Sequence, residues 1–324
     1  MSIATASNAM PTEPSLISVV MPCYNAAPYL AEAVASALHQ TYGNVELILV
    51  DDGSTDGSQD IEATLAKQHA GRLSLLNAPR IGPYPARNLG LKSARGEFVA
   101  FLDADDRWKS TALEKLHAAL VGTNADLSYC GWQNVGEGVT SEPYVPPEYE
   151  KDDPVEAFLR TTPWPIHAAL VKRTVVDHLG GFSVRRFSSM DYDFWLRALA
   201  LTRNIVRVPE VLAYYRWHGS GQISAVKWRQ VLDALAVQQD FVRANSQLVA
   251  HLPARRLQEL TEGQVLKQAY RALWKRDIAS AHKLFRHVAA ARSFGFKELR
   301  HVLSALLPLP AYRWLVHFAD RNDR

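Results

Sequence analysis

Short apolar runs alternate with amphipathic stretches through the first part of the chain. Runs rich in β-branched residues predict buried strands, and apolar residues spaced three or four positions apart predict helices packed against them. The predicted strands are Leu16–Met21, Val45–Val50, Leu73–Leu76, Phe98–Leu102 and Leu127–Cys130. The predicted helices span 28–40, 58–69, 86–94 and 110–120. This alternation is typical of an α/β protein with a mostly parallel, Rossmann-like sheet covered by helices on both faces.

The rest of the chain departs from this alternation. Glycine and proline punctuate 134–165, which predicts a long loop with one short helix near Val155–Leu159, suited to a lid or a binding surface. The pattern then predicts three strands and one helix, at Ile166–Val171, Ile205–Val208, Val211–Tyr215 and Asp191–Leu201. Beyond Gln222 the chain is almost wholly helical and basic, with periodic segments at Trp228–Arg243, Leu257–Trp274, Ala279–Ala291 and Phe296–Leu307. We therefore expect a disordered tail at 1–14, an α/β domain at 15–222 and a C-terminal helical region at 223–324.

Composition narrows the setting in which the protein works. The formal net charge of +3 gives no case for nucleic-acid binding. The two cysteines, Cys23 and Cys130, lie far apart in sequence, which favours a cytoplasmic chain without a disulfide framework. No uninterrupted apolar run is long enough to predict a transmembrane helix. The apolar segment Leu303–Phe318 is broken by Pro308 and Pro310 and flanked by basic residues. It is expected to pack on the α/β domain, with peripheral contact at the inner membrane face or a homodimer as the alternatives.

Acidic residues follow two of the predicted strands. Asp51 and Asp52 come after the second strand, and Asp103 and Asp105 come after the fourth. Because side chains alternate along a strand, Asp103 and Asp105 are expected to point the same way. Two carboxylates at the carboxyl end of a buried strand suit a hard divalent cation that holds a diphosphate. The motif alone is weak evidence, since a helix cap explains it too and Asp-x-Asp recurs at Asp191.

Other segments place polar groups where a nucleotide would need them. Pro22, Tyr24 and Asn25 end the first predicted strand, where backbone, ring and amide groups can meet a base. A carboxylate of Asp51 or Asp52 can accept a hydrogen bond from a base imide or a ribose hydroxyl, although turn capping is the alternative. Arg87, near the start of a helix, suits phosphate oxygens.

Four motifs taken together resemble glycosyltransferase family 2, over Ile17 to about Ser224. They are Ser18–Asn25, Val50–Asp56, Ala86–Gly90 and Gly96–Asp106. The resemblance implies a GT-A fold and an inverting transfer of a sugar from a nucleotide diphosphate to an acceptor hydroxyl, as in cell-envelope polysaccharide biosynthesis. It implies that Asp51 and Asp52 bind the nucleotide, and that Asp103 and Asp105 hold ribose and Mn²⁺ or Mg²⁺.

The resemblance also assigns the later motifs. His218 resembles a third ligand of the metal or diphosphate, and Asp191, in the sequence before Trp195-Leu-Arg, resembles the catalytic base. Met190 stands where the family usually has a first acid. Asp193 lies about 200° further round the predicted helix, so it cannot share one pocket with Asp191. The helix start is expected to favour the charged form of Asp191.

The donor is expected to carry uridine, with guanosine and thymidine still open, and the acceptor is a saccharide, a lipid-linked or another hydroxyl compound. A processive synthase is disfavoured, because Ala213 replaces the glutamine that precedes Arg216-Trp217 in such enzymes. Met190 leaves open a nucleotide-sugar binding module without catalysis. A nucleotidyltransferase is a further alternative, although 22–28 lacks a glycine-rich basic loop. No Gly-x-Gly-x-x-Gly follows a strand, which excludes a dinucleotide oxidoreductase.

Overall fold

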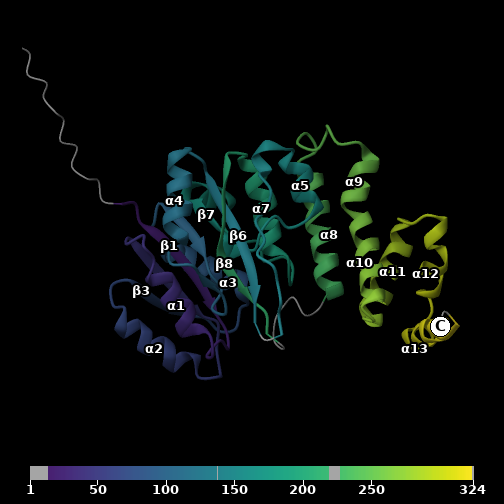
Figure 1. Cartoon of the computed structure of the whole chain (residues 1–324), viewed down its shortest axis with the longest axis horizontal. Helices are drawn as coiled ribbons and strands as arrows, with labels where there is room; N and C mark the ends of the chain where they lie inside the picture. Colours follow the sequence, from purple (N-terminus) through teal and green to yellow (C-terminus); the bar gives the residue numbers. More distant parts are fainter. Residues whose placement is uncertain (1–13, 137, 219–226, 323–324) are drawn as a thin grey trace, which may run out of the picture.

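The computed structural model describes residues 14–136, 138–218 and 227–322 (Figure 1). These residues form a twisted eight-stranded sheet flanked by helices, with further helices beyond the last strand. The predicted tail, apart from Pro14, and the predicted boundary at 222 lie outside the described residues. The division of the chain at that boundary therefore stays a prediction.

The elements follow the predicted alternation closely. The strands are β1 Ile17–Cys23, β2 Val45–Asp51, β3 Leu73–Asn77, β4 Phe98–Phe101, β5 Arg107–Trp108, β6 Leu127–Val135, β7 Ala169–Lys172 and β8 Ile205–Arg216. The helices beside the sheet are α1 Leu30–Leu38, α2 Ser58–Gln68, α3 Pro83–Ser93, α4 Ala112–Gly122, α5 Pro154–Arg160, α6 Arg173–Leu179 and α7 Met190–Leu201. The C-terminal helices are α8 Lys227–Ala244, α9 Ala254–Leu260, α10 Glu262–Trp274, α11 Ile278–Ala291, α12 Leu299–Ser304 and α13 Leu309–Asn322. Single 3₁₀ turns lie at Tyr149–Lys151, Ile166–Ala168 and Phe296–Glu298.

The sheet is mixed but mostly parallel, as predicted. Its strand order is β3-β2-β1-β4-β7-β6-β8-β5. β1 pairs in parallel with β2 and β4, and β2 with β3, so the carboxyl ends of these strands meet at one edge. β7 runs antiparallel to both of its neighbours, and β5 runs antiparallel to β8. The edge at the ends of β1, β2 and β4 is where the acidic motifs were predicted to converge.

Helices cover both faces of the central strands. Every residue of β1, β2 and β4 is buried, which explains their continuous apolar runs. α3 packs closely on one face, because a Cβ atom added at Gly90 would lie 2.6 Å from Val20 Cγ1 and 3.2 Å from Val50 Cγ2. Apolar residues of α1 join the main core on the other face, together with Leu47 and Leu49. The predicted coverage of both faces is thus confirmed.

The fold differs from the prediction in several places, among them β5 and α6, which were not expected, and the break at Thr261 that divides the predicted helix Leu257–Trp274 between α9 and α10. The two strands predicted at 205–215 are one strand, β8, because the register shift between Cys130 and Gly131 absorbs the extra residues around Pro209. The segment 166–171 begins with a 3₁₀ turn before β7. Pro310 lies in the first turn of α13, where its missing N–H costs no helical hydrogen bond, so this segment starts a helix instead of breaking one.

The C-terminal helices share a core of their own and also join the main one. Val237 and Phe241 of α8 belong to the main core, whereas Leu235 of the same helix packs with α10, α11 and α12. α8 therefore connects the two cores. None of the helices in the described part of the chain is both long and apolar enough to cross a membrane.

Candidate active site

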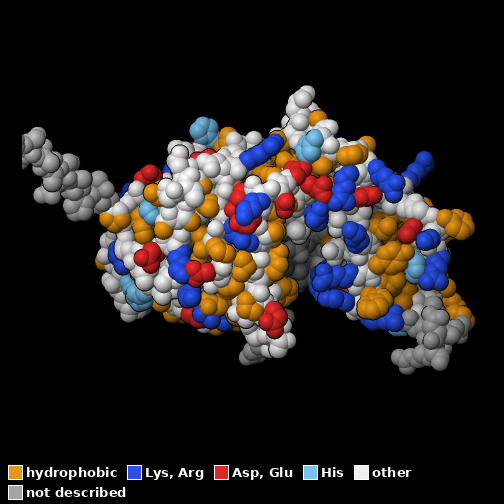
Figure 2. All heavy atoms as spheres, turned by 45° about the horizontal axis from the view of Figure 1, so that its top comes forward, with side chains coloured by type: hydrophobic (Ala, Val, Ile, Leu, Met, Phe, Trp, Pro, Cys, Tyr) orange, Lys and Arg blue, Asp and Glu red, His pale blue; other side chains and the backbone are white. Residues whose placement is uncertain are grey.

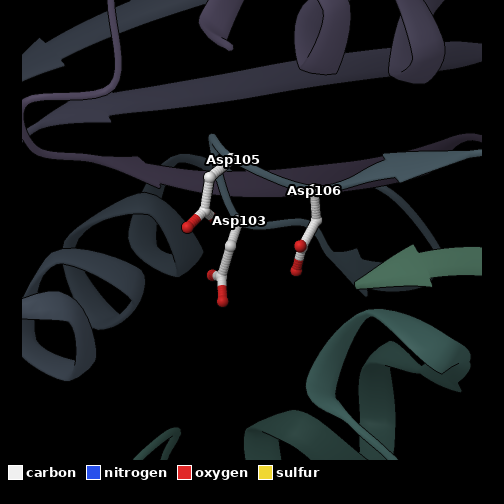
Figure 3. A group of neighbouring side chains, drawn as sticks. All are labelled: Asp103, Asp105 and Asp106. Carbon is white, nitrogen blue, oxygen red and sulfur yellow. The ribbon is translucent and has the colours of Figure 1, made fainter. Parts of the chain in front are cut away.

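Three carboxylates gather in the turn that follows β4. Ligand atoms of Asp103, Asp105 and Asp106 all lie within 4.8 Å of one another, and their side chains leave the turn toward the same side (Figure 3). β4 itself ends at Phe101, so the turn, closed by the Asp106 N–H donating to the Asp103 carbonyl at 3.0 Å, brings them together. The alternation of strand side chains, from which we predicted the pairing of Asp103 and Asp105, is not its cause. The turn also adds Asp106, which the prediction left out.

Asp106 is a buried brace of this turn. Its Oδ1 accepts a hydrogen bond from the Arg216 backbone N–H at 2.7 Å. Its Oδ2 lies 3.0 Å from Nδ1 of His167, whose side chain is also fully buried. Burial raises the pKa of Asp106, and the Asp106 charge raises the pKa of His167 against the opposing effect of burial. The brace leaves Asp103 and Asp105, each partly exposed, as the carboxylates that can face a ligand.

His218 lies beside the acidic turn, as the family resemblance implied. Its Nε2 is 3.0 Å from Oδ2 of Asp105, and the ring of Tyr29 stacks on it with centroids 5.6 Å apart. Burial and the neighbouring carboxylates of Asp106 and Asp103 raise the pKa of Asp105 to about 6. Carboxylate oxygens with one imidazole fit Mn²⁺ or Mg²⁺ by donor type. A cation here would also relieve the repulsion between these carboxylates.

Arg87 projects from α3 to the same place. Its guanidinium is buried and forms an ion pair with Asp103. The rings of Tyr84 and Phe182 flank it at 5.6 and 5.5 Å from the guanidinium carbon. Within the described structure the Arg87 Nε–H has no hydrogen-bond acceptor. A buried cation with a donor to spare suits an oxygen-rich anion such as a diphosphate.

The acids after β2 hold loops in place. Both oxygens of Asp52 accept backbone N–H groups just before α3, those of Ile81 and Gly82. Asp51 Oδ1 accepts the Ser54 N–H at 3.0 Å, and its Oδ2 accepts the side chain of Gln59 at 2.9 Å. Asp51 therefore makes the local turn bond that the capping alternative describes, whereas Asp52 holds the loop before α3. Asp51 shares the edge with a glutamine amide that the sequence did not single out.

The segment after β1 lies next to this loop. Pro22 pairs with Val50 inside the sheet. Asn25 has a positive φ of 50°, and its Oδ1 accepts the Thr55 N–H at 2.8 Å. Tyr24 is half-exposed, with the guanidinium of Arg80 over its ring. Tyr24 and Arg80 are thus flat groups at the strand edge that can stack on a base.

Asp191 lies in the first turn of α7, and the charged groups that act on it include Arg87 and Asp103. Burial raises its pKa, while the Tyr192 backbone N–H and then the charge of Arg87 lower it and the charge of Asp103 raises it. Asp191 therefore interacts electrostatically with residues about a hundred positions earlier in sequence. The expectation that the helix start favours its charged form is wrong in direction, because burial outweighs the helix end. A raised pKa makes the ionised form a stronger base.

Asp193 faces the other way, as the helical geometry predicted. It accepts a hydrogen bond from Arg197 at 2.7 Å and contacts Arg185 at 3.4 Å. Met190, at the position of the usual first acid, is fully buried in the main core. Of the two acids of α7, Asp191 is therefore the one on which the charges of Arg87 and Asp103 act.

Two sets of hydrogen bonds fix the loop that leads to α7. Asn88 of α3 accepts the Phe182 N–H at 2.7 Å and donates to the Phe182 carbonyl at 2.8 Å. Asp233 of α8 accepts the N–H and the hydroxyl of the buried Ser188 at 3.0 and 2.7 Å. The next residue, Ser189, adopts a left-handed φ of 61°. These contacts tie α7 to the helix that carries Arg87 and to the C-terminal helices.

Comparison with known families identifies the chain. The family described as glycosyl transferase family 2 matches residues 18–193, more than half of the chain. The chain belongs to glycosyl transferase family 2. This family 2 chain is 30% identical over 217 residues to TuaG of Bacillus subtilis, provisionally named as a teichuronic acid biosynthesis glycosyltransferase, covering 66% of this chain and 83% of TuaG.

Other relatives are also named as glycosyltransferases. An uncharacterized glycosyltransferase of Haemophilus influenzae is 43% identical over 121 residues, 36% of this chain and 48% of that protein. WfaP of Escherichia coli, named as a UDP-Glc:α-D-GlcNAc-diphosphoundecaprenol β-1,3-glucosyltransferase, is 29% identical over 226 residues, 67% of this chain and 83% of WfaP. The matched region thus spans about half of the Haemophilus protein and 38% of EpsJ from Bacillus subtilis.

Solved structures confirm the GT-A type fold of this family 2 chain. Staphylococcus aureus TarS 1–349 with UDP-GlcNAc superposes with a TM-score of 0.61 at 19% identity, covering 95% of this chain and 92% of that one. The mannosyltransferase PcManGT of Pyrobaculum calidifontis, in complex with GDP-Man and Mn²⁺, gives a TM-score of 0.59 at 20% identity, with coverage of 97% and 82%.

Proposed function

We propose that this chain transfers a sugar from a nucleotide-diphosphate donor to an acceptor hydroxyl, with inversion, one sugar at a time and with the help of a divalent cation. The observation that carries the proposal is the ion pair of Arg87 with Asp103, whose carboxylate lies within 4.8 Å of that of Asp105, together with the charge of Asp191 acting on Arg87. WfaP is named for a UDP-sugar, and TarS and PcManGT are solved with UDP-GlcNAc and GDP-Man. UDP is the donor nucleotide that we favour, with GDP as the competitor.

Asp191, Arg87 and the acidic turn would each have a separate role in a direct displacement at the anomeric carbon. Asp191 accepts the proton of the acceptor hydroxyl while that oxygen bonds to the anomeric carbon from the face opposite the diphosphate. The bond between the anomeric carbon and the diphosphate oxygen breaks, and the nucleoside diphosphate leaves with the bonding electrons. Arg87 stabilises the charge on the departing oxygens. Asp103, Asp105 and His218 would hold Mn²⁺ or Mg²⁺, which supplies further charge neutralisation when bound.

The nucleotide would lie along the ends of β1 and β2. Tyr24 offers its ring to the base, while Pro22 and Asn25 shape the strand end, and Asp51 offers a carboxylate to the base or ribose. Asp52 supports this site by holding the loop before α3. We propose a cytoplasmic chain, since Cys23 and Cys130 are both unpaired thiols.

The acceptor side is expected to involve the long segment between β6 and β7. Tyr144 and Val145 of this segment are exposed, and Tyr144 bridges to Trp132 of β6. We propose that the acceptor is a saccharide or a lipid-linked saccharide of a cell-envelope polysaccharide, which agrees with the names of TuaG and WfaP. Met190 favours one other candidate, a nucleotide-sugar binding module without catalysis, because no second acid stands next to Asp191.

The experiment begins with the donor. Nucleotide diphosphates are screened for thermal stabilisation of the chain with and without Mn²⁺, and the nucleotide sugars that share the best nucleotide are then tested for turnover. Asp191→Asn is expected to reduce turnover by about 10²- to 10⁴-fold while the nucleotide Kd is retained. Asp193→Asn is the matched control, and it is expected to lower stability more than turnover.

Three results would decide against parts of the proposal. Wild-type turnover in Asp191→Asn would show that another group is the base. Metal-dependent nucleotide binding without turnover on any donor and acceptor would favour the binding module. Full activity after removal of divalent cations would show that the acidic turn works without a metal.

A further inference from the structure

Large apolar side chains are exposed on the C-terminal helices. Trp314 is 64% exposed and Phe318 is 52% exposed, both on α13. Leu303, Leu306 and Leu307, in and just after α12, are also exposed. Single exposed apolar residues are ordinary, whereas a group of them marks an interaction surface. We call these five residues the C-terminal apolar surface.

The helices that carry these five residues are fixed by their buried sides. Val302 of α12 and Tyr312 of α13 are buried in the same C-terminal core. His282 of α11 contacts the Leu307 carbonyl at 2.8 Å, which fixes the turn between the two helices. The rings of Trp314 and Phe318 stack with centroids 5.4 Å apart and an angle of 17°. The faces that do not enter this core are therefore exposed to solvent, and on α13 they carry the stacked pair Trp314 and Phe318.

The charges around this surface indicate what it meets. Residues 292–318 contain four basic side chains and one acidic one, with histidines counted as neutral. The basic residues, Arg292, Lys297, Arg300 and Arg313, are all exposed. Apolar and basic side chains also gather over this end of the molecule in Figure 2. A positive field around aromatic and leucine side chains is complementary to anionic lipid headgroups above an acyl layer.

We propose that the C-terminal apolar surface rests in the headgroup layer of an anionic membrane and holds the chain there as a peripheral protein. Trp314 and Phe318 would insert at the level of the headgroups, and Arg300 and Arg313 would contact lipid phosphates. A second copy of this surface is the poorer partner, because it would bring like charges together. The surface belongs to α12 and α13, not to the active site, so the proposal is independent of the donor and acceptor.

The test uses the full chain and vesicles without any acceptor. We expect binding to vesicles of phosphatidylglycerol and phosphatidylcholine, measured by flotation, and at least about tenfold weaker binding to phosphatidylcholine alone. Added salt should weaken the binding, because screening reduces the attraction between exposed charges. The double variant Trp314→Ser with Phe318→Ser should lose about tenfold in affinity.

The matched control changes two exposed apolar residues elsewhere. Val121 of α4 and Leu201 of α7 are 56% and 47% exposed, and Val121→Ser with Leu201→Ser should bind vesicles like the wild type. Circular dichroism and thermal melting check that all variants are folded. Equal binding to neutral and anionic vesicles, or an unchanged affinity of the Trp314 and Phe318 variant, would overturn the proposal. So would a dimer by light scattering that this variant dissociates, if the wild type does not bind vesicles.

Discussion

Asp233 offers the sharpest test of how α7 is positioned. Its Oδ2 accepts both the N–H and the hydroxyl of Ser188, a buried residue two positions before the start of α7. Asp233→Ala removes this acceptor and leaves two donors without partners. Asp233→Asn keeps an oxygen that can accept both bonds, so it separates the hydrogen bonds from the charge.

The cost of the alanine variant follows from these two bonds. A hydrogen bond to a charged group contributes about 1.5–3 kcal/mol, and leaving a buried donor unsatisfied costs about 1–3 kcal/mol. Asp233 is itself partly exposed, which reduces the benefit of its charge. We therefore expect Asp233→Ala to lower the free energy of unfolding by about 3 kcal/mol and Asp233→Asn by about 1 kcal/mol.

The turnover rate should also depend on the contact between Asp233 and Ser188, because Ser188 precedes the left-handed Ser189 and then the helix that carries Asp191. Small displacements of a catalytic group cost up to about 10²-fold in rate. We expect Asp233→Ala to lower kcat about tenfold without changing the nucleotide Kd, and Asp233→Asn to restore kcat. Urea unfolding, steady-state kinetics and calorimetry measure the three quantities. An alanine variant that loses stability but keeps kcat would refute the link between α8 and Asp191.

Two further predictions concern packing and pH. Gly90→Ala should lower the free energy of unfolding by about 1–3 kcal/mol, because its Cβ would lie 2.6 Å from Val20 Cγ1; an unchanged urea midpoint would contradict this. Burial opposes ionisation of Glu46, but hydrogen bonds from Ser18 and Arg95 outweigh it and lower the pKa of Glu46. The contribution of ionised Glu46 to stability is thus present above its ordinary pKa of 4.5 and is lost as pH falls through the lowered pKa. In Glu46→Gln the melting temperature should therefore fall less steeply with pH below 4.5 than in the wild type.

The sequence predicted best the parts of the fold that are buried without interruption. β1, β2 and β4 were placed within one or two residues, because a fully buried strand is a continuous apolar run. β8 was split in two, since its continuity depends on pairing with β6 and not on its own pattern. The start of α13 was missed because a proline that interrupts a helix interior is harmless in a first turn.

The site was predictable where its residues follow strand ends and not where they meet through the core. Asp103 and Asp105 follow β4, so their position at the edge could be expected from the topology. The contact of Asp106 with His167 joins two buried residues from distant segments, and no local pattern signals it. The direction of the pKa shift of Asp191 also escaped prediction, since the burial of one carboxyl depends on the whole surrounding fold.

The paired hydrogen bonds between Asn88 and Phe182 restrict how this family 2 scaffold can diversify. A side-chain amide is needed to donate and accept at once, and Gly181 leaves no room beside it, since an added Cβ would lie 2.5 Å from Asn88 Oδ1. A library built to change substrate preference should keep both residues and vary the exposed segment around Tyr144. Random substitution of Asn88 or Gly181 would mostly yield proteins in which α3 and the loop before α7 are each folded but no longer aligned with one another.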